Sequence, residues 1–301
     1  MEGKMRKEKL EFKDMLTKLR DEKGIQFHLI KENEAMQILQ ERSYYYKLTC
    51  YRKNFEKDAS GKYIDVDFAY LIDIASIDMQ IRYFLLQMSL DIEHGIKTAL
   101  LSHITQNKNE DGYSIIDEFK QYDPYSYEKT ISSFEKNQYL SDMFSKRKQD
   151  LPIWVLVEIM DFGTLSSFVK MYYRKYTPTS LKHASHLITS AKYIRNACAH
   201  SNVLILNIYG RVNQIKSPSM SVKDLAKIYN INILELKQKK LHDLFCLFVL
   251  YKKYASRNSR SYRKNQGSLL IERCKRNKSY YQNNKKILSA FLFFKNLVDF
   301  L

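Results

Sequence analysis

One long apolar pattern restricts the folds open to this chain. Between residues 70 and 105, large apolar side chains recur at steps of three and four residues, which is the spacing along one face of an α-helix. Its members are Ile74, Ile77, Ile81, Phe84, Leu85, Met88, Ile92, Ile96, Leu100 and Ile104. The pattern predicts a single long helix over about 70–105.

The low content of helix-breaking residues also favours helices. The 301 residues include only 8 Gly and 4 Pro, so long stretches contain neither breaker. A hydrophobic content of 45% is normal for a globular protein and excludes bulk disorder. We therefore expect an all-α fold. Further helices are predicted over about 31–42, 126–149, 153–160, 165–173, 180–200, 234–254 and 287–301.

Composition divides the chain into three parts. Residues 1–30 are highly charged, and their apolar residues are few and widely spaced. They predict an N-terminal arm, either a short amphipathic helix or a loosely held segment. Residues 31–254 carry the helical periodicity and form the main helical domain. Residues 255–301 predict a basic loop and a C-terminal helix, because 255–267 is rich in Ser, Arg and Asn without apolar periodicity. That loop is either irregular or ordered by a ligand.

The charge of the chain suggests an anionic partner. The net charge is +17, and residues 251–301 alone hold 13 Lys and Arg against 2 acidic residues. Nucleic acid fits this charge better than a membrane surface, since the tail lacks a clean basic amphipathic helix. Arg and Tyr interleaved with Ser and Asn suit single strands or RNA loops, whereas the plainer alternative is a solvated basic loop. The candidate RNA-binding residues are Lys252, Lys253, Arg257, Arg260, Arg263, Lys264, Arg273, Lys275 and Arg276.

Cysteine spacing and hydropathy exclude several classes of protein. The four cysteines are far apart and form no CxxC pair, so neither a zinc knuckle nor a disulfide framework is indicated. The first residues lack the apolar stretch of a secretory signal, and no run of 18 apolar residues exists. We expect a reduced, cytoplasmic protein with no metal or other cofactor and no membrane partner.

The candidate chemistry lies in residues 190–200. Arg195 and His200 are separated by four residues, and Asn196 follows the arginine. On a continuous helix, five steps of about 100° leave Arg195 and His200 about 140° apart, so one helix would not aim both at one phosphate. The two converge if His200 lies where the helix frays, or if two copies meet across a homodimer. Lost periodicity after Asn202 predicts that the helix ends near His200, and the small neighbours Ala197 and Ala199 favour the homodimer.

These side chains suit metal-independent cleavage of RNA. The nucleophile would be the 2′-hydroxyl of the RNA itself, attacking the adjacent phosphate. His200 can take or give a proton near neutral pH, Arg195 can stabilise charge on the phosphate, and Asn196 can orient the histidine or the phosphate. The spacing alone also occurs by chance, which leaves a purely structural helix as the alternative.

The motif Arg195-Asn196-Ala197-Cys198-Ala199-His200 resembles the Arg-x4-His motif of HEPN ribonucleases. Three further stretches, residues 44–51, 81–94 and 151–165, resemble bacterial abortive-infection proteins of the AbiD/AbiF type. The four stretches occur in the order of that family, and the resemblance covers about residues 30–210. It implies a HEPN-like helical bundle that acts in phage defence, here with additional helices and a basic C-terminal extension.

The resemblance also implies partners and supporting residues. Some members are paired with a small non-coding RNA that acts as antitoxin. Glu93 and Glu158 match positions where a buried carboxylate would position Arg195, with a structural ion pair as the alternative. Asn207 matches a later asparagine of the family. After the motif histidine, however, this chain departs from the family pattern and lacks its second His and its Arg.

Two hypotheses follow from these observations. The first is a dimeric HEPN ribonuclease toxin of phage defence that cuts RNA with Arg195 and His200. The second is a non-catalytic RNA-binding protein of the same fold, whose function depends on a bound small non-coding RNA. An intact Arg195 and His200 pair favours the first, and the basic tail favours an RNA partner in both.

Overall fold

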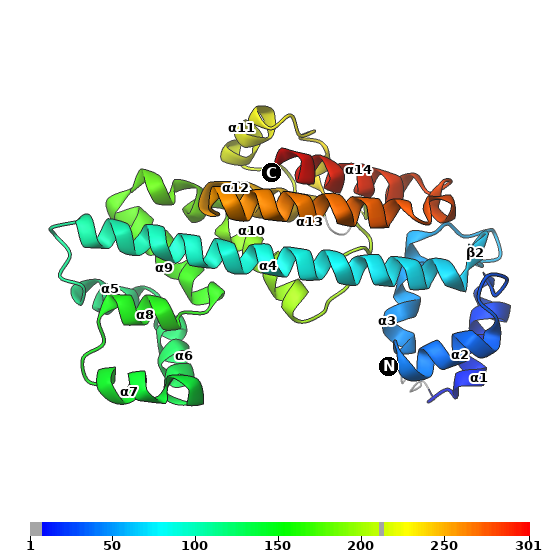
Figure 1. Ribbon diagram of the computed structural model, residues 1–301, viewed down its shortest axis with the longest axis horizontal. Helices are drawn as coiled ribbons and strands as arrows, with labels where there is room; N and C mark the ends of the chain where they lie inside the picture. The colour runs from blue at the N-terminus through cyan, green and yellow to red at the C-terminus, as the bar shows by residue number, and fades with distance from the viewer. Residues whose placement is uncertain (1–7, 211–213) are drawn as a thin grey trace, which may run out of the picture.

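Helices form most of the structure. The computed structural model describes residues 8–210 and 214–301, and within them the chain is an all-α bundle, which confirms the predicted fold class. The α-helices, labelled in Figure 1, are α1 (Phe12–Thr17), α2 (Glu32–Glu41), α3 (Tyr45–Cys50), α4 (Phe68–Gln106), α5 (Ser114–Tyr122), α6 (Pro124–Glu135), α7 (Ser141–Arg147), α8 (Ile153–Ile159), α9 (Phe162–Tyr176), α10 (Lys182–Ala199), α11 (Met220–Ile228), α12 (Lys239–Tyr254), α13 (Arg257–Lys275) and α14 (Lys285–Phe300).

Short elements join these helices. Strands β1 (Ile25–Gln26) and β2 (Val66–Asp67) pair in parallel, with Ile25 opposite Val66. One π-helical turn covers Lys18–Glu22, and 3₁₀ turns cover Tyr51–Asn54, Gln138–Leu140, Thr179–Leu181, Glu235–Lys237 and Lys278–Tyr281. In residues 8–210 and 214–301, no helix is long and apolar enough to cross a membrane.

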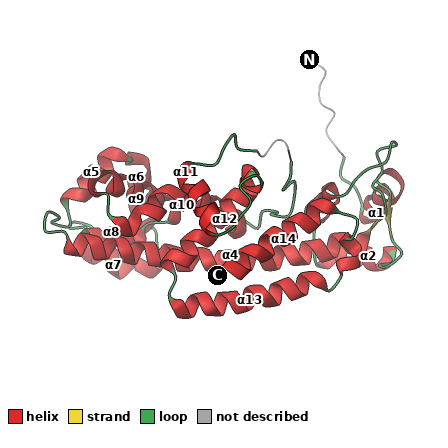
Figure 2. Ribbon diagram, turned by 90° about the horizontal axis from the view of Figure 1, so that it is seen from above, coloured by secondary structure: helices red, strands yellow, loops and turns green. Residues whose placement is uncertain are grey.

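Helix α4 spans most of the molecule, and many other elements pack along it (Figure 1). Its start is fixed by Asp67, whose carboxylate accepts a hydrogen bond from the Ala69 N–H at 2.8 Å. The helix predicted over about 70–105 is confirmed, because α4 covers Phe68–Gln106. Seen from above, α13 lies along one side of α4, and α10 and α12 lie on the other (Figure 2).

Two hydrophobic cores lie along α4. The larger core contains α4 from Ile77 onward, together with α8, α9, α10, α12 and the C-terminal helices. The smaller core contains α1 to α3 and the start of α4, and it buries Leu16 and Leu19. The described part of the predicted N-terminal arm is therefore a packed helix, whereas residues 1–7 lie outside the described residues. The domain boundaries at 30 and 254 stay predictions.

Residues 257–267, most of the stretch predicted as a loop, belong to helix α13. The helix begins after Ser256, whose hydroxyl accepts a hydrogen bond from the Ser259 N–H at 3.1 Å. Its buried residues are Gly267, Leu270 and Ile271. A Cβ added at Gly267 would lie 2.7 Å from a methyl group of Val298, so α13 approaches α14 closely. Such a narrow buried face produces no apolar periodicity, and the loop prediction is wrong for that reason.

The predicted polar helix over 126–149 is divided in two. Helix α6 ends at Glu135, and α7 begins only at Ser141. Between them, the side chain of Asn137 accepts a hydrogen bond from the Tyr139 N–H at 3.0 Å and starts a 3₁₀ turn. Asparagine competes for backbone donors in this way, which interrupts a helix that apolar spacing alone would continue.

Candidate functional site

Helix α10 carries the three predicted catalytic residues and ends where the sequence predicts, with His200 at its C-cap. Beyond the cap, Ser201 adopts a left-handed conformation with a φ of 54°. The Ser201 N–H donates to the Cys198 carbonyl at 3.1 Å. The Asn202 N–H donates to the Ala197 carbonyl at 2.8 Å. These two bonds form a Schellman motif, which ends the helix sharply.

His200 still follows the helical path. Its N–H donates to the Asn196 carbonyl at 3.0 Å, as in a regular α-helix, so α10 does not fray before this residue. Helical geometry therefore keeps the Arg195 and His200 side chains about 140° apart. Of the two arrangements that would bring them to one phosphate, a frayed helix does not occur here.

Arg195 is half-buried, and its bonding capacity is only partly used. Its Nη1 donates to Oδ1 of Asn196 at 3.2 Å. Its Nε is buried and has no hydrogen-bond partner among the described residues. The His200 side chain is exposed. Asn196 therefore contacts the arginine, and the guanidinium keeps donors that a ligand could fill.

The turn after α10 is fixed by two buried charged residues of α4. Asp78 and Arg82 form an ion pair at 3.1 Å. Oδ1 of Asp78 accepts hydrogen bonds from the N–H groups of Leu204 at 2.9 Å and Ile205 at 2.7 Å. Nη1 of Arg82 donates to the Ser201 carbonyl at 3.0 Å. The ion pair thus satisfies backbone donors and acceptors that would otherwise be buried without partners.

Three further side chains complete this network. The Tyr51 hydroxyl donates to Oδ2 of Asp78 at 2.9 Å. Nδ2 of Asn54 donates to the carbonyl of residue 205 at 2.8 Å. Nζ of Lys240, from α12, donates to the carbonyls of Leu204 at 2.8 Å and Leu206 at 2.6 Å. Burial raises the pKa of the Tyr51 phenol and lowers the pKa of the Lys240 amine.

Sequence reasoning assigned no role to Asp78, Arg82 or Lys240. A signal was present in the long apolar pattern, because Asp78 and Arg82 stand four residues apart and so share one face of the helix. Both are almost fully buried, with side-chain exposures of 0% and 6%. Buried charges on an apolar helix need partners, but the backbone groups that Asp78 and Arg82 contact lie more than 100 residues away in the sequence.

Neither predicted supporting carboxylate contacts Arg195. Glu93 pairs with Lys97 at 3.2 Å. Glu158 is exposed, and its backbone carbonyl accepts a hydrogen bond from Lys97 at 3.0 Å. The structural ion pair that was the alternative is therefore the one that Glu93 forms, and the helices α4 and α8 are joined through Lys97.

Asn207, the third predicted supporting residue, follows the turn that Asp78 and Arg82 fix. It adopts a left-handed conformation with a φ of 51°, which asparagine tolerates better than most residues. Its carbonyl accepts a hydrogen bond from the Gly210 N–H at 3.2 Å. Asn207 thus closes a tight turn, and its exposed side chain borders a small pocket with Lys53 and Asn54.

The predicted RNA-binding residues divide into two groups. Half-buried members bond inside the protein, as Arg263 does to Asp91 at 3.4 Å and Arg273 to Asp73 at 2.8 Å. The half-buried members are Lys252, Arg260, Arg263 and Arg273. The exposed members are Lys253, Arg257, Lys264, Lys275 and Arg276. Of the exposed group, Lys275 pairs with Glu272 at 2.6 Å and Lys264 donates to the Asp299 carbonyl at 2.8 Å. All five exposed side chains lie at the surface, where a large ligand can reach them.

Helix α13 and the turn after His200 occupy opposite faces of α4. Arg82 contacts the turn, whereas Asp73 and Asp91 contact α13. Arg82 lies nine positions along the helix from each aspartate, and nine helical steps amount to a rotation of about 180°. The structure therefore does not bring the basic residues of α13 together with Arg195 and His200.

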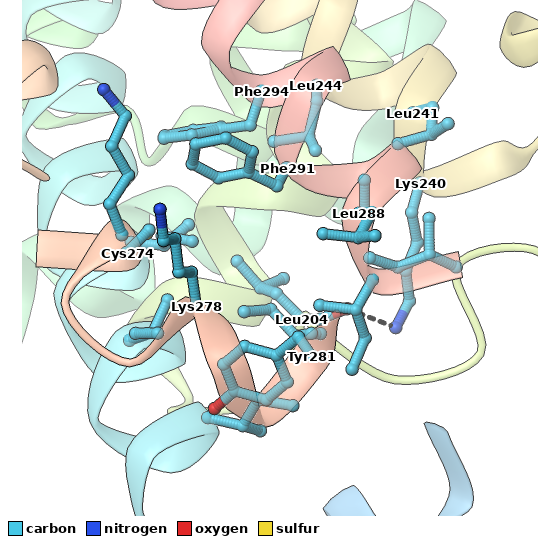
Figure 3. A pocket seen from close by; sticks show the side chains of 18 of the residues that line it. Leu204, Lys240, Leu241, Leu244, Cys274, Lys278, Tyr281, Leu288, Phe291 and Phe294 are labelled. Atoms are coloured by element: carbon cyan, nitrogen blue, oxygen red, sulfur yellow. Dashed lines mark hydrogen bonds between the residues drawn. The ribbon is translucent and has the colours of Figure 1, made fainter. Parts of the chain in front are cut away.

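An apolar cavity of about 390 Å³ lies behind the turn that follows His200 (Figure 3). Leu204 forms part of one wall, Tyr281 part of another, and Phe291 and Phe294 of α14 line the far side. Lys240 borders the cavity but directs its amine to a backbone carbonyl (Figure 3). The turn after His200 thus packs against a cavity that side chains do not completely fill.

No group of three or more His, Cys, Asp or Glu side chains is arranged to hold a metal ion in the part of the chain that the structure describes. The four cysteines are free. Cys198, in α10, is buried, and burial raises its pKa to about 12. Its thiol is therefore a packing group beneath the Arg195 and His200 segment rather than a reactive one.

Comparisons with known proteins identify a family. A search of curated proteins found no match, and neither did a search of solved structures. The family model described as Abi-like protein matches residues 37–206. That range contains α10, the turn after it and the Asp78 and Arg82 pair, and it stops before α11 to α14. Because the match covers more than half of the chain, the protein belongs to the Abi-like protein family.

Proposed function

We propose that this protein is an abortive-infection toxin of phage defence, a metal-independent HEPN-type endoribonuclease of the AbiD/AbiF kind that acts in the cytoplasm. Membership of the Abi-like family supports the defence role. The observation that carries the catalytic role is the end of α10. There, Arg195 keeps a buried donor that has no partner among the described residues, and His200 is exposed. The buried Asp78 and Arg82 pair fixes the turn that follows.

The reaction uses the 2′-hydroxyl of the RNA as nucleophile. His200 removes the proton of this hydroxyl, or donates one to the departing 5′-oxygen, and Arg195 stabilises the charge that develops on the phosphate. The 2′-oxygen forms a bond to phosphorus while the bond to the 5′-oxygen breaks. The products are a 2′,3′-cyclic phosphate and a free 5′-hydroxyl. Asn196 holds the arginine through its hydrogen bond at 3.2 Å.

The active form is a homodimer in which two copies of α10 share one cleft. On one helix the two side chains diverge by about 140°, so a second copy supplies the missing partner. A surface suited to that contact lies nearby on α4, where Met79, Tyr83 and Leu90 are 38%, 57% and 53% exposed. These three side chains lie about 60–100° around the helix from Arg82, next to the pinned turn.

The second candidate function is RNA binding without cleavage, with a bound small non-coding RNA as the defining partner. The separation of α13 from α10 favours it, because RNA held by the exposed cations of α13 would lie on the other side of α4 from His200. In the toxin proposal, the same surface holds the RNA antitoxin.

Variants of the α10 residues decide between the two functions. His200→Ala and Arg195→Ala should each lower the rate of RNA cleavage by about 10²- to 10⁴-fold, the usual contribution of one acid–base or charge-stabilising group. The matched control is His186→Ala, which removes an exposed histidine from the other end of α10. The measurement is cleavage of a mixed-sequence RNA, with analysis of the product ends. Equal cleavage by wild type and His200→Ala, or none by either, contradicts the enzyme.

Mixing two inactive variants tests the shared site. If Arg195 of one copy acts with His200 of the other, mixed dimers of Arg195→Ala and His200→Ala contain one intact site. Activity should then return to about a quarter of the wild-type level, since half of the dimers are mixed and each has one of two sites. A site built from a single chain would stay inactive after mixing.

A further inference from the structure

A polar pocket lies between α6, α9 and α10, beside the helix that carries Arg195. Its volume is about 360 Å³. Lysines enter it from all three helices, and two tyrosines stand at its border: Lys129, Lys170, Lys192, Tyr122 and Tyr125. We propose that this pocket binds the backbone of single-stranded RNA and leads the strand to Arg195. This inference rests on the proposed function and assigns the substrate path to α6, α9 and α10 rather than to α13.

Two of the lysines have no acidic partner among the described residues. Nζ of Lys170 donates to the Thr189 hydroxyl at 2.5 Å, and Lys192 has no ion pair. Burial, together with the positive charges of Lys192 and Arg174, lowers the pKa of Lys170. The lysines of the pocket outnumber its aspartates, so a net positive charge remains to attract an anion, and a phosphodiester supplies one per nucleotide.

The two acidic residues of the pocket already have partners. Asp123 accepts hydrogen bonds from the Ser126 N–H at 3.1 Å and from the Ser167 hydroxyl at 2.5 Å. Asp161 accepts from the Thr164 N–H at 2.7 Å and pairs with Lys129 at 2.6 Å. Their charges stabilise the first turns of α6 and α9 and neutralise one lysine. The cations of Lys170 and Lys192 are left for a ligand.

The tyrosines add a second element of single-strand recognition. Tyr125 is 79% exposed and Tyr122 is 41% exposed, although both are large rings beside a charged pocket. The Arg174 guanidinium lies 5.7 Å from the centre of the Tyr122 ring. A basic groove with exposed aromatic rings is the usual arrangement for single-stranded nucleic acid, because lysines bind phosphates while bases stack on the rings.

The pocket is continuous with the candidate catalytic residues along α10. Thr189, Lys192 and Asn196 stand three and four residues apart, so they share one face of the helix. The seven helical steps from Thr189 to Asn196 cover about 10 Å of that face. Asn196 in turn bonds to Arg195. The whole path lies within residues 37–206, the range that the family model matches, whereas α13 lies outside it.

The test measures RNA binding by a protein that cannot cut. In the His200→Ala background, fluorescence anisotropy of an unstructured, labelled 12-nucleotide RNA is followed at several salt concentrations. Lys170→Gln/Lys192→Gln should raise Kd by about tenfold or more and reduce the slope of log K against log[salt] by about 1.4, because two phosphate contacts are lost. The matched control is Lys9→Gln/Lys13→Gln, which removes the same charge from two exposed lysines near α1 and should leave Kd within about twofold.

Tyr125→Ala separates stacking from charge. It should raise Kd by about fivefold to tenfold and leave the salt slope unchanged, because a stacked base is lost but no phosphate contact is. Thermal unfolding checks that each variant is folded. If the loss of the Lys170 bond to Thr189 destabilises the double variant, Lys192→Gln alone should still show about half of the change in slope.

Three outcomes would overturn the inference. The first is an unchanged Kd in the Lys170 and Lys192 variants. The second is a loss confined to Lys253→Gln/Arg257→Gln, at the end of α12 and the start of α13. The third is equally tight binding of a free mononucleotide. Cleavage by the wild-type protein is measured separately. Absence of cleavage with pocket-dependent binding refutes the nuclease and keeps the RNA path, whereas cleavage without pocket dependence does the reverse.

Discussion

Two buried aspartates on α4, Asp78 and Asp73, hold distant parts of the chain in different ways. Asp78 is fully buried and fixes the turn after His200, 126 residues further along the chain. Asp73 is 5% exposed and fixes α13 and the turn after it, where Arg273 and Tyr281 contact its carboxylate at 2.8 and 2.7 Å. One carboxylate serves the candidate active site and the other attaches the C-terminal extension.

The partners of the two carboxylates differ in kind. Asp78 accepts from two backbone N–H groups, so it sets the path of the main chain itself. Among the described residues, Asp73 accepts from side chains alone, and these fix the position of a helix that already has its own backbone bonds. The partners of Asp78 lie inside the family-matched range, and those of Asp73 lie outside it. The structure thus separates a network beside His200 from a second network that attaches the C-terminal extension.

The largest effect is expected from Asp78→Ala. This change leaves Arg82 buried without its ion pair and leaves two backbone N–H groups without acceptors, so the free energy of unfolding should fall by about 3–5 kcal/mol. Urea denaturation measures the loss. RNA cleavage should disappear even at temperatures where the protein is folded. A loss below about 1 kcal/mol would show that the turn does not depend on this carboxylate.

A smaller loss, about 2–3 kcal/mol, is expected from Asp73→Ala, because the Arg273 side chain is 16% exposed and can turn to water. The same urea titration measures it. The variant should keep its RNA cleavage, since its partners lie on the other face of α4 from His200. A folded Asp73→Ala protein that no longer cleaves RNA would contradict the separation of the two networks.

Variants of Tyr51 and Tyr281 allow the Asp78 and Asp73 networks to be compared at alkaline pH. Burial raises the pKa of both Tyr51 and Tyr281, and the neighbouring carboxylates add to the effect. Above about pH 10, the unfolded chain ionises these phenols and the folded chain does not, so their contribution is complete below that pH and declines above it. Thermal melts from pH 8 to 11 should therefore show a steeper fall of Tm for wild type than for Tyr51→Phe.

At neutral pH, Tyr51→Phe and Tyr281→Phe should each cost about 1–2 kcal/mol, because each removes one hydrogen bond to a carboxylate. Tyr46→Phe is the control, because the Tyr46 ring is 83% exposed and has no carboxylate bond among the described residues. Parallel pH curves for wild type and all three variants would show that neither network contributes to the alkaline loss.

The smallest effect is expected from filling the cavity between the two networks. Its walls include Leu204 from the Asp78 side and Tyr281 from the Asp73 side, and Ala290 of α14 borders it. Ala290→Leu should raise the free energy of unfolding by about 0.5–1.5 kcal/mol, as cavity-filling changes commonly do. Urea denaturation measures whether the free energy of unfolding rises or falls. A destabilised variant would mean that the cavity is already closed in solution.

The sequence predicted the elements that a regular pattern of apolar residues marks along the chain. The long apolar repeat gave the bounds of α4 to within two residues, because a regular buried face repeats in the sequence. The end of α10 at His200 was also predicted, since periodicity stops there. Helix α13 was missed, because the ion pairs of Arg263 and Arg273 hold it in place of an apolar stripe.

The sequence by itself determined that this chain is an all-α protein and placed Arg195, Asn196 and His200 together at the end of one helix. Periodicity and adjacency are local properties, and they need no knowledge of the rest of the fold. Only the tertiary structure decided what surrounds them. Asp78, Arg82 and Lys240 meet the turn after His200, and α13 packs on the opposite face of α4, because buried charges and backbone groups must find partners wherever the packed chain brings them.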